Sequence, residues 1–371
     1  PLNPWNRSIP MKAAAARFSA IFILALTFYI DPIAADSRFG SLTHMHDPDM
    51  RGQDGQWVRP HPGPFIWGSI EPVPGEFAWQ FSDKVVSYAQ DHKQKILATI
   101  WPFANWEQQS CNRRKTKSPF GRRFPRFLSK PCSIDAYNEF LIKLIDRYDG
   151  DNKNDMPGLT SPIRYWEIMN EPEFEMFFRG SQQEFIDIFI SSSKLIRKQQ
   201  PGAKIVMAGA AGMMRDSRRF WDEVFPQIKN YFDIATVHHI APPDGGCDRD
   251  LWVGEFAELL KKHRINKPIW VTEAQPTRSC GVVKSYVAAF VAGAEVIFDV
   301  GVRAPGRKMS KKDRQSLQQL GHEYDHFSSV SLVSPHTARF LFADGSEKIL
   351  ELNGANKSQS NQTGSDINRN Q

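Results

Sequence analysis

The chain has 371 residues, of which 41% are hydrophobic, 12% aromatic and 24% charged, so a wholly disordered, collagen-like or coiled-coil protein is excluded. This length suffices for a single α/β barrel, which typically takes ~250 residues. The formal charge of +6 arises from 47 basic and 41 acidic side chains, and because the basic ones gather in particular segments, we expect no nucleic-acid partner.

The N-terminal segment, residues 1–35, predicts a secretory signal peptide. Basic residues precede an apolar run from Ala20 to Ile30, and the small residues Ala34 and Ala35 follow it. The run is shorter than the ~20 residues of a bilayer-spanning helix, so we favour cleavage over an uncleaved anchor. We therefore expect a secreted or periplasmic protein with no stable membrane span after cleavage.

Residues 36–328 alternate short β-rich runs with longer segments of helical period, which indicates repeated βα units. One helical segment is Gln183–Lys198, where apolar residues recur at three- and four-residue spacing. The units predict an α/β fold, a (β/α)8 TIM barrel with a parallel sheet. The predicted strands are Phe39–His44, Pro64–Trp67, Lys95–Trp101, Ile163–Met169, Lys204–Ala208, Ile234–His238, Pro268–Thr272 and Glu295–Val300.

The cysteines are even in number, and in an oxidising compartment such a set predicts disulfide bonds. Cys111 and Cys132 bracket a single loop after the third predicted strand. Cys247 and Cys280 lie in the loops after the neighbouring sixth and seventh strands. We therefore predict the pairs Cys111–Cys132 and Cys247–Cys280, both on the catalytic face of the barrel.

The loop between the first cysteine pair is strongly basic, and a second basic run, Arg303–Arg314, follows the eighth strand. Such clusters are typical of a solvated surface that keeps a protein soluble or adheres to an acidic cell wall. The alternative hypothesis is that they steer an anionic glycan, such as a uronate-containing or sulfated polymer, toward the barrel mouth. The cations of the loop are Arg113, Arg114, Lys115, Lys117, Arg122, Arg123, Arg126 and Lys130.

Two glutamates close predicted strands at the end where TIM barrels carry their active sites. Glu171 follows the fourth strand and Glu273 ends the seventh. Carboxyl groups ~5–5.5 Å apart suit retaining glycoside hydrolysis, in which one attacks the anomeric carbon and the other protonates the leaving oxygen. Because the ionised nucleophile disfavours a second charge, we expect a raised pKa for its partner. The sequence thus predicts double displacement on an oligo- or polysaccharide, with no metal and no cofactor.

These residues resemble the clan A retaining glycoside hydrolases, which include β-xylosidases, α-L-iduronidases, β-galactosidases, mannanases and cellulases. The resemblance implies that Glu171, in Asn-Glu-Pro, is the acid/base and that Asn170 holds the substrate 2-hydroxyl. It also implies that Glu273, in Trp-Val-Thr-Glu, is the nucleophile. The segments Trp67–Trp79 and Phe232–His238 are similar to stretches of several families in the clan.

The chain also departs from the pattern of the clan at particular strand ends. The clan often has an arginine at the end of strand two, a place that either Arg59 or His61 fills here. Ile240 stands where a tyrosine often orients the nucleophile. Strand eight lacks the tryptophan that commonly floors the sugar site.

Aromatic and histidine side chains near the strand ends are predicted to contact the sugar. Trp67, Trp101 and Trp106 fall at or beyond the ends of strands two and three, although the first two also suit packing inside the barrel. Histidines at the end of strand six are suited to orienting hydroxyls and carboxylates. The predicted substrate-binding residues are Asn170, His238, His239, Trp67, Trp101, Trp106 and Trp270.

Two other functions compete with hydrolysis of a glycoside. A barrel that binds glycan without catalysis is one, and the two intact glutamates argue against it. A metal-dependent amidohydrolase-type barrel is the other, but the fifth predicted strand ends without the histidine that such a site needs. That metal site would draw on His44, His46, His238, His239 and Asp299.

The C-terminal part predicts a small β extension and then a tail. Ala338–Phe342 and Lys348–Leu352 flank an Ala-Asp-Gly-Ser turn, so we expect a β-hairpin within residues 329–352. Residues 353–371 are almost entirely polar and predict a disordered tail.

Overall fold

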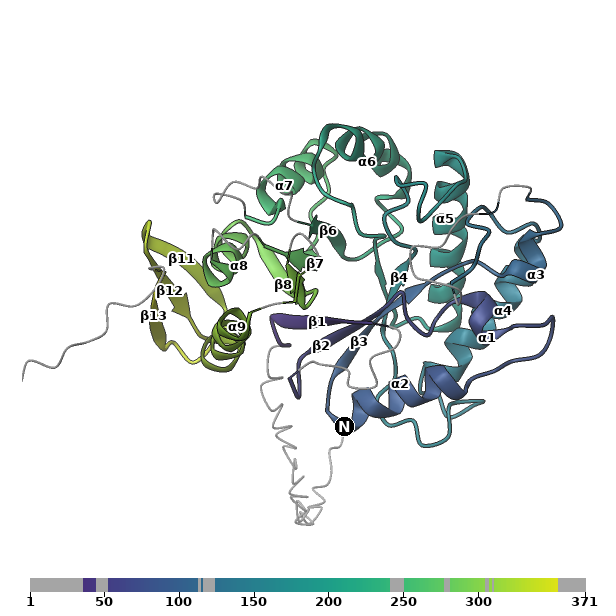
Figure 1. Ribbon diagram of the computed structural model, residues 1–371, viewed down its shortest axis with the longest axis horizontal. Helices are drawn as coiled ribbons and strands as arrows, with labels where there is room; N and C mark the ends of the chain where they lie inside the picture. Colours follow the sequence, from purple (N-terminus) through teal and green to yellow (C-terminus); the bar gives the residue numbers. More distant parts are fainter. Residues whose placement is uncertain are drawn as a thin grey trace, which may run out of the picture. The chain divides into compact units, whose positions relative to one another are not determined.

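The computed structural model describes residues 36–44, 53–112, 115, 124–240, 250–276, 281–303, 307–308 and 310–352. Within them, parallel strands form one eight-stranded sheet in the order β5-β4-β3-β2-β1-β8-β7-β6 (Figure 1). Bridges from Val206 to Ile234 and from Ala210 to Val237 join the two ends of this order, so the sheet closes into the predicted (β/α)8 barrel. The strands are β1 Phe39–His44, β2 Trp57–His61, β3 Lys95–Ile100, β4 Tyr165–Ile168, β5 Lys204–Val206, β6 Ala235–Ile240, β7 Ile269–Gln275 and β8 Ala294–Asp299.

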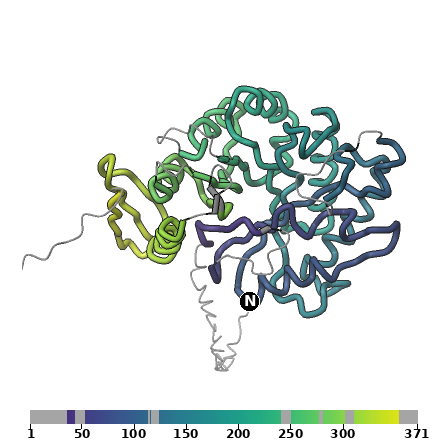
Figure 2. Tube along the Cα trace, in the orientation of Figure 1, coloured from purple at the N-terminus to yellow at the C-terminus, as the bar shows by residue number. Residues whose placement is uncertain are grey.

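Figure 2 shows the helices arranged around the sheet. Their apolar faces pack against it. Helix α5 confirms the predicted Gln183–Lys198, and a capping box sets its start. Ser181 accepts a hydrogen bond from the Glu184 N–H, and the Glu184 carboxylate accepts one from the Ser181 N–H. The helices are α1 Trp67–Ile70, α2 Gln80–Asp91, α3 Asn105–Gln108, α4 Ile134–Tyr148, α5 Gln182–Gln199, α6 Arg215–Ile228, α7 Val253–Lys262, α8 Val282–Val291 and α9 Lys311–Tyr324.

A cluster of inward-facing apolar side chains fills the inside of the barrel. The rings of Trp57 and Trp270 meet edge to face with centroids 4.8 Å apart, and Tyr165 stacks on Trp270 at 5.5 Å. Residues two apart on a strand share a face, so Arg59 and Glu167 form the next layer toward the carboxyl ends. The apolar cluster therefore lies beneath a polar layer at the barrel mouth.

The predicted second strand, Pro64–Trp67, is wrong. The strand is Trp57–His61, and Trp67 instead begins helix α1. The sequence pattern did not predict β2, because a buried strand is not expected to contain a cation such as Arg59 and because Pro60 interrupts the strand-forming residues.

The C-terminal extension is a three-stranded antiparallel sheet rather than a hairpin alone. Strands β12 Thr337–Leu341 and β13 Glu347–Glu351 form the predicted hairpin, and β11 Ser329–Ser334 adds a third strand beside β12. Phe340 packs against Tyr324 of α9, with ring centroids 4.7 Å apart. The serine-rich β11 has few buried side chains, so its sequence lacks the apolar pattern that predicts a strand.

Several predictions fall on residues that lie outside the described ranges. These are the signal peptide within residues 1–35 and the polar tail of residues 353–371. In the described part of the chain, none of the helices combines the length and apolarity needed to cross a membrane.

A short antiparallel pair of strands, β9 Val302–Arg303 and β10 Arg307–Lys308, follows β8.

Candidate active site

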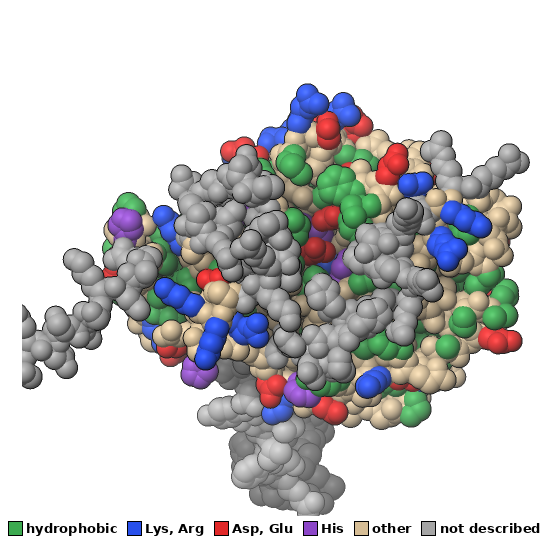
Figure 3. Space-filling model, viewed as in Figure 1, with side chains coloured by type: hydrophobic (Ala, Val, Ile, Leu, Met, Phe, Trp, Pro, Cys, Tyr) green, Lys and Arg blue, Asp and Glu red, His purple; other side chains and the backbone are tan. Residues whose placement is uncertain are grey.

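Polar side chains from four strands meet at the carboxyl-terminal mouth of the barrel. Arg59 comes from β2, Asn170 and Glu171 follow β4, His238 lies on β6 and Glu273 on β7. Figure 3 shows acidic and histidine atoms in the hollow at the middle of the viewed face. The side chains of Glu171 and Glu273 are 8% and 12% exposed, so both carboxyl groups are nearly buried yet open to solvent.

The two predicted glutamates lie close together across the mouth. Oxygens of Glu171 and Glu273 and a ring nitrogen of His238 all lie within 4.8 Å of one another. This separation is shorter than the ~6.5–9.5 Å at which inverting glycosidases hold their carboxyl groups.

Arg59 organises the cluster from below. Its Nη1 donates to Glu273 Oε1 at 2.8 Å, and its Nη2 donates to Asn170 Oδ1 at 2.6 Å. The ring of His61 is more distant, with Nε2 3.8 Å from Glu273 Oε1. Of the two candidates for the end of strand two, Arg59 is therefore the one in direct contact with Glu273.

Glu167 is a site residue that sequence reasoning missed. It is fully buried, and its Oε2 accepts hydrogen bonds from Arg59 Nε at 2.8 Å and Thr99 Oγ1 at 2.5 Å. Burial alone lowers the pKa of Arg59, but Glu167 and Glu273 outweigh it and leave that pKa raised. The alternation of side chains along β4 could have identified Glu167, because it lies on the same inward face of the strand as Tyr165.

The environment of Glu171 favours its protonated form. Burial raises the pKa of Glu171 to about 8, with Glu167 adding to the rise and Arg59 opposing it. Near neutral pH the carboxyl group therefore holds a proton. The direction agrees with the pKa rise expected from the sequence, but its cause is burial and Glu167 rather than the charge of Glu273.

His238 is a neutral hydrogen-bonding partner of Glu171. Its Nδ1 lies 2.6 Å from Glu171 Oε1, and its Nε2 lies 2.9 Å from Thr272 Oγ1. Burial lowers the pKa of His238 to about 4, against the raising effect of Glu273. Because the Thr272 hydroxyl can donate or accept, either neutral tautomer is satisfied, so His238 suits both protonation states of Glu171.

Unusual backbone geometry presents this part of the site. Met169 and Glu171, on either side of Asn170, have φ values of 69° and 40°. The Glu171 N–H donates to Gly209 O at 3.2 Å, and a Cβ at Gly209 would collide with the ring of His238. Such conformations persist where surrounding contacts impose them, often at functional sites.

The predicted sugar-stacking tryptophans are mostly core residues. Trp67 and Trp101 are fully buried and Trp270 is 3% exposed, so none of the three offers a ring face to a sugar. Their indole N–H groups donate to Glu71, Pro62 and Glu295, which satisfies them inside the fold. These three predictions are wrong, whereas Trp106 is only partly buried and stays a prediction.

His239 lies beside a tryptophan that the sequence did not single out. The His239 side chain is 2% exposed, and its ring centroid is 6.2 Å from that of Trp252. Trp252 is partly buried and precedes α7.

Within the described ranges, two groups of side chains have the spacing of metal ligands. One is Glu171, His238 and Glu273, and the other is the acidic group Asp149, Asp151 and Asp155. Neither contains His44, and His46 lies outside the described residues. Asp299 accepts a hydrogen bond from Tyr286 Oη at 2.8 Å. The metal set of an amidohydrolase-type barrel is therefore not assembled among the described residues.

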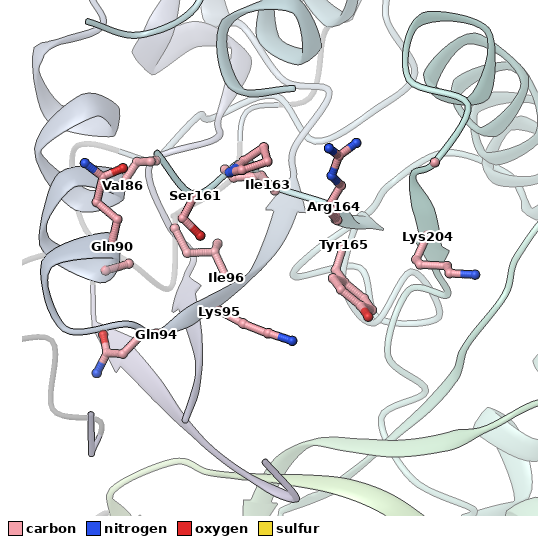
Figure 4. A pocket seen from close by; sticks show the side chains of 13 residues that line it. Val86, Gln90, Gln94, Lys95, Ile96, Ser161, Ile163, Arg164, Tyr165 and Lys204 are labelled. Carbon is pink, nitrogen blue, oxygen red and sulfur yellow. The ribbon is translucent and has the colours of Figure 1, made fainter. Parts of the chain in front are cut away.

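A separate pocket opens at the opposite ends of the strands. It has a volume of about 370 Å³ and is lined by Lys95, Tyr165 and Lys204, the first residues of β3, β4 and β5 (Figure 4). This face of a TIM barrel serves stability rather than catalysis.

The predicted disulfide Cys111–Cys132 is present, with Cα atoms 5.8 Å apart. Cys247 and Cys280 lie outside the described residues, so their pairing stays a prediction. Of the basic loop between the first pair, only Lys115, Arg126 and Lys130 are described cations.

The sequence matches no protein-family model and no curated protein. Solved structures that share the fold include the following three. A glucosidase from Croceicoccus marinus is 12% identical, with a TM-score of 0.57 over 80% of this chain and 68% of its own. The GH39 enzyme from Xanthomonas axonopodis pv. citri is 13% identical, with a TM-score of 0.56 over 84% and 71%. A β-galactosidase from the psychrophilic Marinomonas ef1 is 14% identical, with a TM-score of 0.52 over 77% of this chain and only 59% of its own length.

Proposed function

We propose that this protein is a retaining glycoside hydrolase with Glu273 as nucleophile and Glu171 as acid/base. The observation that carries the proposal is the approach of these two carboxyl groups within 4.8 Å. Retaining enzymes hold the pair ~5–5.5 Å apart. Their surroundings also divide the roles, because Arg59 donates to Glu273 while burial raises the pKa of Glu171 to about 8.

In the first step, Glu273 attacks the anomeric carbon and the bond to the leaving oxygen breaks. Glu171 gives its proton to that oxygen, so the leaving group departs as a neutral alcohol. Arg59 keeps the attacking carboxylate oriented. Asn170 Nδ2 is buried and has no hydrogen-bond partner among the described residues, which suits a substrate hydroxyl beside the anomeric centre.

In the second step, a water attacks the anomeric carbon and releases Glu273. Glu171, now ionised, takes a proton from that water and returns to its starting state. His238 donates or accepts at Nδ1 as Glu171 changes its charge, with Thr272 matching at the other ring nitrogen.

The proposed substrate class and cellular location rest mainly on sequence patterns. The oligo- or polysaccharide substrate follows from the resemblance to clan A, and the hypothesis that this substrate is anionic rests on the basic segments. A secreted or periplasmic location follows from residues 1–35, and the Cys111–Cys132 disulfide supports it.

The proposal is tested by hydrolysis of a panel of aryl glycosides and polysaccharides, with NMR of the first-formed anomer. We expect retention of configuration, no turnover in Glu273→Ala, and residual activity of Glu171→Ala on dinitrophenyl glycosides, whose leaving groups need no proton. Glu175→Ala is the matched control, because this glutamate follows the same strand but is 81% exposed. An inverted product, or full activity in both active-site variants, would refute double displacement.

A further inference from the structure

Large apolar side chains are exposed on the loops that follow β4 and β5 and at the end of β6. Phe174 is 36% exposed, Met176 48%, Met214 54% and Ile240 46%. Figure 3 shows hydrophobic side chains directly beside the acidic hollow. Exposed apolar groups gathered beside a polar site mark a binding surface more often than isolated ones do.

Hydrogen bonds join these loops to one another and to Glu171. The Phe174 N–H donates to Glu171 O at 3.0 Å, which makes a turn directly after the acid. Glu173 accepts hydrogen bonds from the Ala211 N–H at 2.8 Å and from Trp221 Nε1 at 2.9 Å. The loop after β4 is therefore tied to the loop after β5, three residues before Met214.

Trp252 adds an aromatic ring to the same side of the mouth. Its φ of 68° is unusual for a bulky residue, and the preceding Leu251 also has a positive φ of 55°. A Cβ added at Gly212 would stand 3.2 Å from the Trp252 indole nitrogen, so the glycine allows the ring to pack on the loop after β5. A strained conformation that presents an aromatic ring beside His239 suggests a functional role.

The chemistry of the proposed reaction says which part of the substrate meets this surface. Glu171 protonates the leaving oxygen, so the leaving group must lie on the Glu171 side of the anomeric carbon. Glu273, which accepts a hydrogen bond from Arg59, attacks that carbon from the opposite face. The loops after β4 and β5, together with the end of β6 that places His238 against Glu171, therefore surround the leaving group.

We infer that Phe174, Met176, Met214, Ile240 and Trp252, here termed the apolar rim, bind an apolar leaving group. The bond that is cleaved then joins the sugar end of the proposed oligo- or polysaccharide through oxygen to an aryl or alkyl group, rather than to a further sugar. Methionines adapt their shape to varied apolar groups, and Trp252 supplies a flat face for a ring. The inference rests on the proposed glycosidase function and specifies its leaving-group side.

An alkyl glycoside series, from ethyl to octyl on the sugar that the panel identifies, tests the inference. The leaving-group basicity is nearly constant along this series, so differences report contacts rather than chemistry. We expect kcat/KM to rise with chain length, by up to about fourfold for each fully buried methylene. We also expect the octyl glycoside to be cleaved faster than a disaccharide of the same sugar.

Variants of the apolar rim test whether these side chains cause the dependence of kcat/KM on alkyl chain length. Met214→Ser and Trp252→Ala should flatten the dependence on chain length, and Trp252→Phe should keep most of it. Phe81→Ser is the matched control, because Phe81 is 43% exposed on α2 and outside the rim. Met214 is a solvent-exposed residue, so its variant tests the rim even if Trp252→Ala fails to fold.

The experiment distinguishes failure of the apolar-rim inference from failure of the proposed glycosidase function. If alkyl glycosides are hydrolysed at equal rates, or the disaccharide is preferred, the rim is not a leaving-group site while the glycosidase function stands. If no glycoside is hydrolysed by the folded protein, the proposed function and this inference fail together.

Discussion

A single buried cation balances the charges of the site. Arg59 is fully buried and contacts Glu167, Glu273 and Asn170 with one guanidinium. Removing one partner of a buried ion pair typically costs ~3–5 kcal/mol, because the remaining charge is left uncompensated. Glu167 is therefore a positioning residue, which holds Arg59 without touching the substrate.

We predict that Glu167→Gln moves the alkaline limb of the kcat/KM profile to lower pH. Activity requires protonated Glu171, so it is lost as pH rises through the pKa of about 8. The negative charge of Glu167 raises that pKa, and an amide of the same shape removes this effect while keeping an oxygen for Arg59.

The measurement is kcat/KM from pH 5 to about 10 on an aryl glycoside, with Glu175→Gln as the control. The charged and titratable groups around Glu171 are Arg59, Glu167, Glu173, His238 and Glu273. An alkaline limb that stays in place in Glu167→Gln would mean that this residue only supports the fold.

At the scale of elements, the connection from α3 to α4 is held at several points. The Ser133 N–H donates to Glu107 Oε1 at 2.6 Å, and Ser133 in turn caps α4 by accepting from the Ala136 N–H. The disulfide Cys111–Cys132 spans the same two helices and closes a loop with a sequence separation of 21.

The disulfide should stabilise the fold without taking part in catalysis. We predict that the double variant Cys111→Ser, Cys132→Ser loses up to ~3 kcal/mol of unfolding free energy, because a loop of this length gains entropy in the unfolded state. Thermal unfolding monitored by circular dichroism measures the loss, and kcat/KM on an aryl glycoside should change little. An unchanged Tm would show that the bond adds nothing to the contacts of Glu107 and Ser133.

At the scale of the whole molecule, the charge is uneven. The eight cations between Cys111 and Cys132 exceed the net +6 by themselves, so the rest of the chain carries a small net negative charge. Five of the eight cations between the two cysteines lie outside the described residues, so the steering of an anionic glycan stays a hypothesis from sequence. A solvated basic surface is the alternative.

Steering predicts a response to salt. The screening length falls from ~10 Å at 0.1 M to ~3 Å at 1 M ionic strength, so kcat/KM on acidic polymers should fall over this range while that on neutral polymers changes little. Arg122→Glu with Arg123→Glu should reduce the low-salt advantage of the acidic substrates. Equal rates for acidic and neutral polymers at low salt would identify the loop as a charged surface alone.

The sequence by itself determined the barrel and its two central glutamates. Both follow from local patterns, since the alternation of strand and helix periods marks the βα units and places Glu171 and Glu273 at strand ends. The Cys111–Cys132 pair is equally local, because its members bracket a single loop.

Only the tertiary structure decided which side chains are buried and with what. Arg59 precedes the strand predicted from the sequence, and only the fold brings Glu167 and Glu273, more than a hundred positions away, into contact with it. Trp101 reads as a sugar platform until its neighbours cover it, while Trp252 gains its place from Gly212 and His239. Burial and pKa depend on long-range neighbours, and periodicity along a chain carries no information about those.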